Sequence, residues 1–266
     1  MDFKDFQTVS EDSGNLEICA LASGSNGNCY YVGNERDAVL VDAGISCKQI
    51  LKRMDEKGLA PSKIKAVFIS HEHSDHIRGA RVFAKRLHVP VYMTAKTFVA
   101  TYKNLQPDYP RYFEPGDVIP VGEFTVHSFL KNHDASEPCS FRITYQDKNV
   151  GVFTDIGAPC ENVKSHFQAC DVIFLESNYD DEMLQTGPYP WYLKKRIAST
   201  HGHLSNLQAS SLLGSHGGVN LKCVFLSHLS AENNTPELAM KAFLSHASVY
   251  DVRITYRDRA GDLFLI

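Results

Sequence analysis

Short apolar runs recur along the chain from residue 16 onward, separated by stretches in which apolar residues return at helical spacing. The short runs are rich in β-branched and aromatic residues, which predicts mostly buried strands. These strands are expected at residues 16–22, 38–41, 66–69, 89–93, 124–130, 149–154, 172–175 and 223–226. Phe141, Ile143 and Tyr145 alternate with polar residues, and residues 252–256 repeat this pattern, which predicts two half-exposed strands.

The stretches between the strands predict helices at residues 46–57, 77–87, 162–169, 205–215 and 235–246. Gly58 follows the first of them, and Pro236 opens the last. This mixture of strands and helices predicts an α/β fold in which two sheets pack together with helices outside, a four-layer αβ/βα sandwich. Because no repeat or linker interrupts residues 15–266, we expect one domain there, preceded by a flexible extension at residues 1–14.

Composition narrows the class of protein. Hydrophobic residues make up 43% of the 266 residues and charged residues 22%, which is typical of a folded globular chain. A net charge of -4 excludes a uniformly basic nucleic-acid binder but leaves room for a local basic patch. No apolar run approaches the roughly 18 residues of a membrane span, and the seven cysteines form no C-x-x-C pair. We therefore expect a cytoplasmic protein with reduced cysteines and no membrane partner.

The densest chemical signal follows the strand expected at residues 66–69. His71, His73, Asp75 and His76 place four potential metal ligands within six residues at the end of a rigid element. His71 and His73 can turn toward one ion, while Asp75 and His76 can reach a second ion beside it. A polar loop with solvated histidines is the alternative. The H-E-x-x-H motif of zinc proteases is excluded, because Asp75 stands where that motif needs histidine.

Two ions need more ligands than this segment offers, and other strand ends supply them. Candidate donors after the predicted strands are Asp42, His133, Asp155 and His228. His127 competes with His133, but it alternates with Thr125 and Phe129 inside a strand and is expected to be a packed strand residue.

This order of residues resembles that of the metallo-β-lactamase superfamily. Residues 21–31, 187–192 and 202–206 are further similar to the YycJ/WalJ group of bacterial exonucleases. The resemblance implies that His71, His73 and His133 bind one ion, that Asp75, His76 and His228 bind another, and that Asp155 bridges them. Asp42 would orient ligands through hydrogen bonds. The His-rich donor set favours zinc, although manganese or iron would also fit.

Two adjacent divalent ions lower the pKa of a bridging water and stabilise charge on the attacked group, so hydrolysis is the expected reaction. Asp75 would also be catalytic by orienting that water or accepting its proton. The resemblance implies a phosphodiester substrate and a DNA exonuclease acting 5′ to 3′ on duplex DNA.

The segment between Asp155 and His228 carries the candidate substrate contacts. Lys194, Lys195 and Arg196 would follow phosphates, and Tyr189, Trp191 and Tyr192 would stack on bases. The alternative is an ordinary amphipathic helix beginning near Pro190, with Trp191 as its core anchor.

His203 is the candidate to hold a phosphate near the metals and take part in catalysis, together with Ser205 and Asn206 at a helix start. Helix capping by Ser205 explains part of this motif equally well. Ser25 and Asn26 lie in a glycine-rich loop that either approaches the substrate or forms a tight hairpin turn.

Other hydrolases stay open as alternatives at this point. A thioester hydrolase of the glyoxalase II type, a cyclic phosphodiester hydrolase and a lactone hydrolase would use the same scaffold. The β-CASP nucleases are disfavoured because the chain between Asp155 and His228 is too short for their inserted domain. A di-iron redox module is disfavoured, because it would need an acid in place of His73 and a fused flavin domain. A catalytically silent regulatory protein is the remaining alternative.

Overall fold

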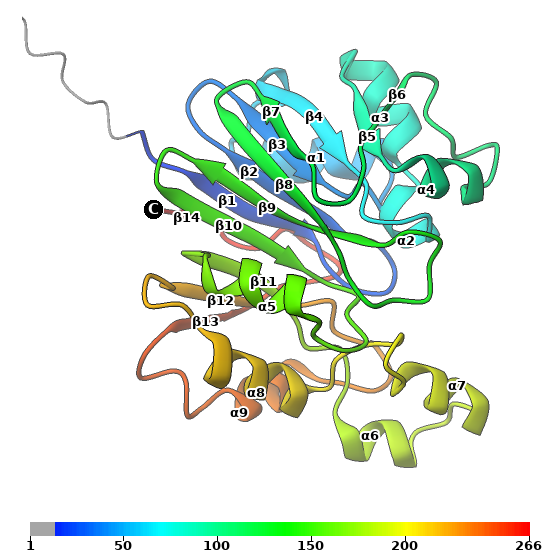
Figure 1. The fold of residues 1–266 in the computed structure, drawn as a ribbon, viewed down its shortest axis with the longest axis vertical. Coiled ribbons are helices and arrows are strands. Elements are labelled where there is room, and N and C mark those ends of the chain that lie inside the picture. The colour runs from blue at the N-terminus through cyan, green and yellow to red at the C-terminus, as the bar shows by residue number, and fades with distance from the viewer. Residues whose placement is uncertain (1–13) are drawn as a thin grey trace, which may run out of the picture.

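The computed structural model describes residues 14–266, so the extension expected at residues 1–14 lies, apart from Gly14, outside the described residues. Two seven-stranded sheets face each other, and helices cover their outer faces (Figure 1). The predicted four-layer αβ/βα sandwich is therefore confirmed. None of the helices within this described part combines the length and apolar character needed to cross a bilayer.

The first sheet is built from the beginning of the chain and its last strand. In spatial order it contains β14 (Phe264–Leu265), β1 (Glu17–Ala22), β2 (Cys29–Gly33), β3 (Ala38–Val41), β4 (Ile64–Phe68), β5 (Val91–Met93) and β6 (Pro110–Tyr112). Strands β3 to β6 are parallel, whereas β14, β1, β2 and β3 pair antiparallel.

The second sheet mirrors this mixed arrangement. Its spatial order is β13 (Asp251–Ile254), β12 (Cys223–Ser227), β11 (Val172–Glu176), β10 (Lys148–Phe153), β9 (Cys139–Tyr145), β8 (Phe124–Leu130) and β7 (Val118–Val121). Strands β10 to β13 are parallel, and β7, β8, β9 and β10 pair antiparallel.

Helices occupy two kinds of position. The first sheet is covered by α1 (Cys47–Glu56) and α3 (Ala80–Leu87), with the 3-10 helix η1 (Pro61–Lys63) leading into β4. The second is covered by α5 (Glu161–Gln168), α8 (Asn206–His216) and α9 (Pro236–Ala242). The short helices α2 (Ser74–Ile77), α4 (Ala95–Ala100), α6 (Asp181–Thr186) and α7 (Trp191–Ile197) lie on one side of the sandwich in Figure 1.

Apolar side chains fill three layers of core. In β3, Val39 and Val41 join the layer between the sheets, whereas Ala38 and Leu40 join the layer beneath α1 and α3. A strand buried on both faces needs apolar residues at every position, which explains its continuous apolar run. The third layer lies between the second sheet and α5, α8 and α9.

Several boundaries differ from the sequence expectation. The helix expected at residues 77–87 begins only at Ala80, as α3, and Ile77 is the last residue of the separate helix α2. Gly79 lies between them, where a Cβ atom would lie 2.0 Å from the Ile45 carbonyl oxygen. The last predicted helix ends at Ala242 rather than residue 246, and the last predicted strand ends at Ile254, before Tyr256. The elements β2, β6, β7, β14, α4 and α6 were not predicted, because short segments carry too few periods to be recognised.

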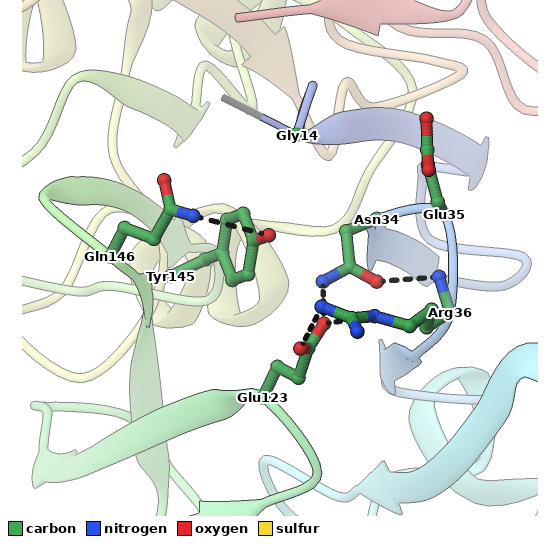
Figure 2. Close-up of a pocket in the computed structure, with 7 residues that line it drawn as sticks. All are labelled: Gly14, Asn34, Glu35, Arg36, Glu123, Tyr145 and Gln146. Carbon is green, nitrogen blue, oxygen red and sulfur yellow. Dashed lines mark hydrogen bonds and ion pairs between the residues drawn. The ribbon is translucent and has the colours of Figure 1, made fainter. Parts of the chain in front are cut away.

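The two sheets are also tied at the edge where β3 and β8 begin. Arg36, in the turn between β2 and β3, forms an ion pair with Glu123 in the turn between β7 and β8 (Figure 2). Asn34 donates a second bond to the same carboxylate over 2.7 Å. Tyr145 and Gln146 complete the wall of a 240 Å³ cavity at this edge. Apart from Glu35, the polar side chains that line it bond to one another, which indicates a structural role.

Phe68 shows how the core supports the ends of the strands. Its buried ring stacks on Tyr92 at 4.8 Å and meets Phe141 of the opposite sheet at 5.5 Å. We expect Phe68→Ala to lower the free energy of unfolding by about 3–5 kcal/mol, because it leaves a cavity between the sheets. Urea denaturation measures this change. Val99→Ala, at a side chain 80% exposed, should be nearly neutral, and equal losses in both variants would contradict the assignment.

Candidate metal centre

Six strands bring polar residues to a single edge of the sandwich. Strands β3 and β4 are parallel, as are β10, β11 and β12, and β8 runs in the same direction as β10. Because strands of one direction end at the same edge, the residues that end or follow them meet there. These residues are Asp42, His71, His73, Asp75, His76, His133, Asp155, Glu176 and His228.

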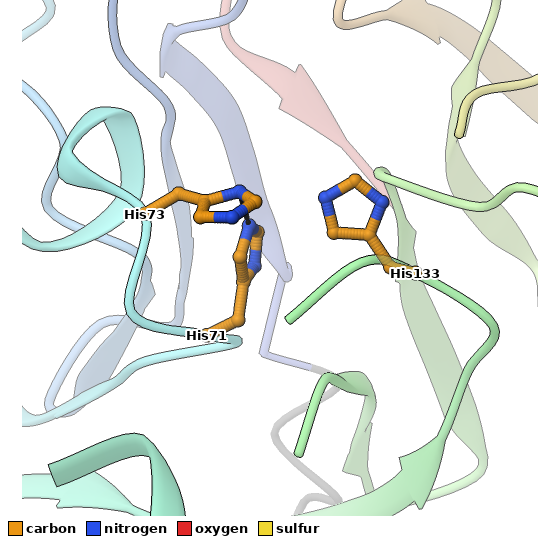
Figure 3. Close-up of side chains that lie close together, drawn as sticks. All are labelled: His71, His73 and His133. Atoms are coloured by element: carbon orange, nitrogen blue, oxygen red, sulfur yellow. Dashed lines mark hydrogen bonds between the residues drawn. The ribbon is translucent and has the colours of Figure 1, made fainter. Parts of the chain in front are cut away.

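One cluster consists of three histidines. His71 and His73 follow β4, His133 follows β8, and their ligand atoms lie within 4.8 Å of one another (Figure 3). His71 Nε2 is 3.0 Å from His73 Nδ1. His133 Nδ1 donates to the Gly202 carbonyl over 3.0 Å, which leaves its Nε2 for the cluster. The structure thus places His133 in this cluster, whereas His127 lies in β8 beside His166.

A second cluster contains Asp75, His76 and His228, again with ligand atoms within 4.8 Å. Asp42 accepts a hydrogen bond from His76 Nδ1 over 2.7 Å, as expected for a residue that orients a ligand. His228 Nδ1 donates to Glu176 over 2.9 Å. Both histidines therefore keep Nε2 for the interior of the cluster.

Asp155 lies between the two clusters. One carboxylate oxygen is 3.2 Å from His76 Nε2, and the other is 3.5 Å from His228 Nε2 and 3.9 Å from His133 Nε2. The side chain is buried. Asp155 is thus placed to contact groups of both clusters at once.

Two of the histidine donor atoms have no hydrogen-bond partner in the part of the chain that the structure describes, as expected for atoms that bind a cation. Nε2 of His133 and Nε2 of His228 are both buried and find no hydrogen-bond partner among residues 14–266. Leaving such an atom unpaired is costly, and a divalent ion would satisfy it. Histidine nitrogen and carboxylate oxygen are the ligands that Zn²⁺, Mn²⁺ and Fe²⁺ accept. The clusters can therefore bind metal ions.

Burial and neighbouring charges shift the pKa values of several groups at the two clusters. Burial lowers the pKa of His71 well below its usual range and lowers that of His133 to about 4, so both imidazoles are neutral, the form that binds metals. Burial also opposes charge on Asp155, but His228 and His76 outweigh it and hold the Asp155 pKa low. Burial opposes protonation of His228, yet Asp155 raises its pKa to about 10, so a metal ion that binds His228 would displace a proton.

Three residues at this edge adopt left-handed backbone conformations. Their φ angles are 62° at Asp42, 56° at Asp155 and 57° at His228. Such conformations are unfavourable for residues other than glycine and cluster at functional sites. The backbone is therefore strained at three of the strand ends that carry residues of the centre.

Glu176 is a part of the centre that the sequence analysis missed. It accepts bonds from His203 Nδ1 over 2.8 Å, from His228 Nδ1 over 2.9 Å and from the backbone N–H groups of Ile156 and Leu204. Burial opposes charge on Glu176, but His203 and His228 outweigh it and lower its pKa to about 2. The available signal was its place as the polar end of the apolar run at residues 172–175.

The glycine-rich loop after β1 also reaches the centre. Asn28, which was not predicted, donates to Asp75 Oδ2 over 3.4 Å and lies 3.2 Å from His76 Nε2. Gly44, in the loop after β3, packs directly against the backbone of Asp75, where a Cβ atom would lie 1.5 Å from the Asp75 carbonyl oxygen. The glycine-rich loop is therefore a close approach to the site as well as a turn.

A cavity of about 590 Å³ opens above the two clusters. Of the predicted substrate contacts, Ser25, Tyr189, Arg196 and His203 line it. The other predicted contacts, which are Asn26, Trp191, Tyr192, Lys194, Lys195, Ser205 and Asn206, are not part of its wall.

The aromatic and basic residues of α7 differ in what they contact. Trp191 is 73% exposed, so its interpretation as a core anchor is wrong. Lys195 lies over the Trp191 ring, Lys194 donates to the Gln185 carbonyl, and Arg196 forms an ion pair with Asp134 beside His133. The helix α7 therefore presents its aromatic and basic side chains to solvent and to the cavity.

Ser205 and Asn206 require a correction. Both are buried: Ser205 caps α8 through a capping box, and Asn206 bonds to Ser177 and Asn234. Their polar atoms are engaged within the fold, so the capping interpretation accounts for them and contact with a substrate does not.

Comparisons with known proteins agree with this geometry. The family model for the metallo-beta-lactamase superfamily matches residues 22–193. Exodeoxyribonuclease YycJ of Bacillus anthracis is 37% identical over 227 residues, which cover 84% of this chain and 86% of that protein. Exodeoxyribonuclease WalJ of Streptococcus pneumoniae is 34% identical over 239 residues, covering 88% and 89% of the two chains.

A solved structure shows the same fold. The crystal structure of the metallo-beta-lactamase fold protein YhfI from Bacillus subtilis aligns with a TM-score of 0.69 at 20% identity, covering 95% of this chain and 100% of that one. The resemblance to the superfamily and to the YycJ/WalJ group is confirmed. The chain belongs to the metallo-β-lactamase superfamily and is a metallohydrolase.

Proposed function

We propose that this metallohydrolase is a DNA exonuclease that hydrolyses phosphodiester bonds, with the 5′-to-3′ polarity on duplex DNA that its family resemblance implies. The observation that carries the proposal is the similarity, at 34–37% identity over most of the chain, to relatives named exodeoxyribonucleases. The cavity supports it, because Arg196 and Tyr189 line its wall above the His/Asp clusters. A phosphate contact and an aromatic stacking surface are what a nucleic-acid strand requires.

The proposed centre holds two divalent ions, zinc or manganese, with iron as a further option. His71, His73 and His133 would bind one ion, and Asp75, His76 and His228 the other, in agreement with the two clusters. Asp155 would contact both. When bound, two such ions supply an activated water and neutralise charge on the phosphate.

The remaining steps belong to side chains of the chain. Asp75 lies at the cavity wall, where it would orient the attacking water and accept its proton. The water oxygen attacks phosphorus, the bond to the leaving oxygen breaks, and His203 would donate a proton to that oxygen. Glu176 accepts a bond from His203 Nδ1, so Nε2 would be the atom that makes this transfer.

A substrate panel tests the proposal. We expect the metal-loaded protein to shorten end-labelled duplex DNA from its ends, and to act weakly on RNA and on a thioester. Product length on denaturing gels distinguishes stepwise removal of nucleotides from internal cleavage, and labels at either end give the polarity. Thioester hydrolysis without activity on any nucleic acid would contradict the proposal.

Arg196 should contribute more to DNA binding than its basic neighbours. It lines the cavity, whereas Lys195 lies over Trp191 outside the wall. We expect Arg196→Ala to raise the KM for DNA by about tenfold and to weaken its salt dependence, because one phosphate contact is lost. Lys195→Ala is the matched control and should change KM less. A larger effect of Lys195→Ala would place the strand outside the cavity.

A further inference from the structure

The cavity at the metal centre is lined by side chains of two different chemical kinds. One part of its lining consists of polar side chains of the centre, among them His73, Asp75, Asp155 and His228. Its walls carry aromatic and apolar side chains from two distant parts of the chain. Ala100 and Tyr102 come from the end of α4 and the loop after it, and Tyr189, Leu193 and Ile197 come from α7 and the segment before it.

Tyr102 is unusual among these wall residues because its side chain is 74% exposed although it borders the catalytic cavity. Tyr189 borders the same cavity from the other half of the chain and is half-buried. What distinguishes Tyr102 and Tyr189 from the exposed aromatic residues elsewhere in residues 14–266 is that both line the cavity that contains the metal centre. The flat faces of their rings suit planar ligands, and nucleobases stack on such faces.

The dimensions of the cavity limit how a nucleic acid can enter it. Cavities of about 300–1,000 Å³ enclose a single small ligand, so the 590 Å³ found here suits a nucleotide-sized group. A base pair with both of its backbones does not fit such a space. A terminal nucleotide separated from its pairing partner matches this volume.

We propose that Tyr102 and Tyr189 hold the terminal nucleobase between the two walls, so that the enzyme takes an unpaired strand end and a duplex must open at its end before cleavage. The inference rests on the proposed nuclease function and specifies its substrate. Opening a terminal pair is easiest where the bases are mismatched. Mismatched ends are therefore better substrates than fully paired blunt ends.

Abasic nucleotides separate base stacking from phosphate binding. Single-stranded DNA with two abasic nucleotides at each end keeps its phosphates but offers no base to the tyrosines. For the wild type, we expect abasic ends to lower kcat/KM by about a hundredfold, because the contacts of the base to both tyrosines are lost and one such contact contributes about tenfold. Tyr102→Ala should lower kcat/KM on natural ends by about tenfold, because the contact to Tyr189 remains, and cause no further loss on abasic ends.

Two variants control for indirect effects. Tyr102→Phe keeps the ring and should behave as the wild type on both substrates. Tyr109→Ala removes a ring that is 86% exposed and lies in the same loop, but outside the cavity wall, and should have no effect. A Tyr102→Ala loss that is equal on natural and abasic ends would overturn the stacking role.

Duplex substrates test the requirement for an unpaired end. We expect blunt duplexes to be cleaved about tenfold more slowly than duplexes with two mismatched terminal pairs, because the paired ends must first open. Equal rates on the two duplexes would overturn this part of the inference. A wild-type enzyme that cleaves natural strands but ignores these changes contradicts the inference alone. A wild type inactive on every nucleic acid overturns the proposed function and the inference together.

Discussion

Replacing Asp75 by alanine is expected to lower kcat by about 10³-fold while the fold stays intact. Asp75 lies in the first turn of α2, at the wall of the cavity and only partly buried, so little of the core depends on it. Its carboxylate is 3.4 Å from His76 Nε2 and 3.7 Å from His228 Nε2. The substitution would remove both a ligand of the second ion and the group that orients the attacking water.

The measurement combines steady-state cleavage of labelled DNA with metal analysis and circular dichroism. Glu72→Gln is a matched control, because Glu72 is a carboxylate in the same segment that accepts a bond from the Ser136 backbone and belongs to neither cluster. This control should keep most of the activity. Unchanged turnover in Asp75→Ala would remove Asp75 from the mechanism.

Asp155→Asn is expected to abolish activity and to remove the thermal stabilisation that metal gives the wild type. Metal ions that bind only the folded state stabilise it, by about 2.7 kcal/mol at a hundred times Kd. Asp155 is the carboxylate that approaches histidines of both clusters, so its loss weakens both sites. Asparagine is preferred to alanine here because it tolerates the left-handed backbone at this position.

Thermal unfolding with and without added zinc or manganese measures this effect independently of turnover. Asp171→Asn provides the control, since Asp171 is a buried aspartate at the opposite end of β11 that accepts a bond from the Asn149 backbone. Its Tm should rise with metal as that of the wild type does. An equal metal-induced rise in Asp155→Asn would show that Asp155 does not bind the ions.

Much of the centre could be predicted because strand periodicity is a strong signal and strand ends are readily located. Polar residues directly after apolar runs meet at one edge when the strands share a direction. Asp42, His133, Asp155 and His228 are therefore expected beside the segment that begins at His71, and in the structure they lie there. His133 and not His127 is expected to be a ligand, because an alternating position inside a strand faces the surface of the sheet and not its end.

Other features could not be predicted, for identifiable reasons. Glu176 looks like the end of an apolar run, and only the three-dimensional neighbourhood shows that two histidines bond to it. The spacing of Trp191 fits a buried or an exposed helix face equally, because sequence does not show which neighbours cover α7. The motif that begins at Ser205 satisfies a helix cap and a phosphate site with the same residue types, and packing decides between them.

The origin of the donors has a consequence for the mechanics of the molecule. Each cluster takes histidines from a segment after β4 in one sheet and from a segment after β8 or β12 in the other. An ion bound in either cluster is therefore a cross-link between the two sheets. Its affinity depends on how the sheets are aligned, so a change deep in the layer between them is transmitted to metal binding without touching a ligand.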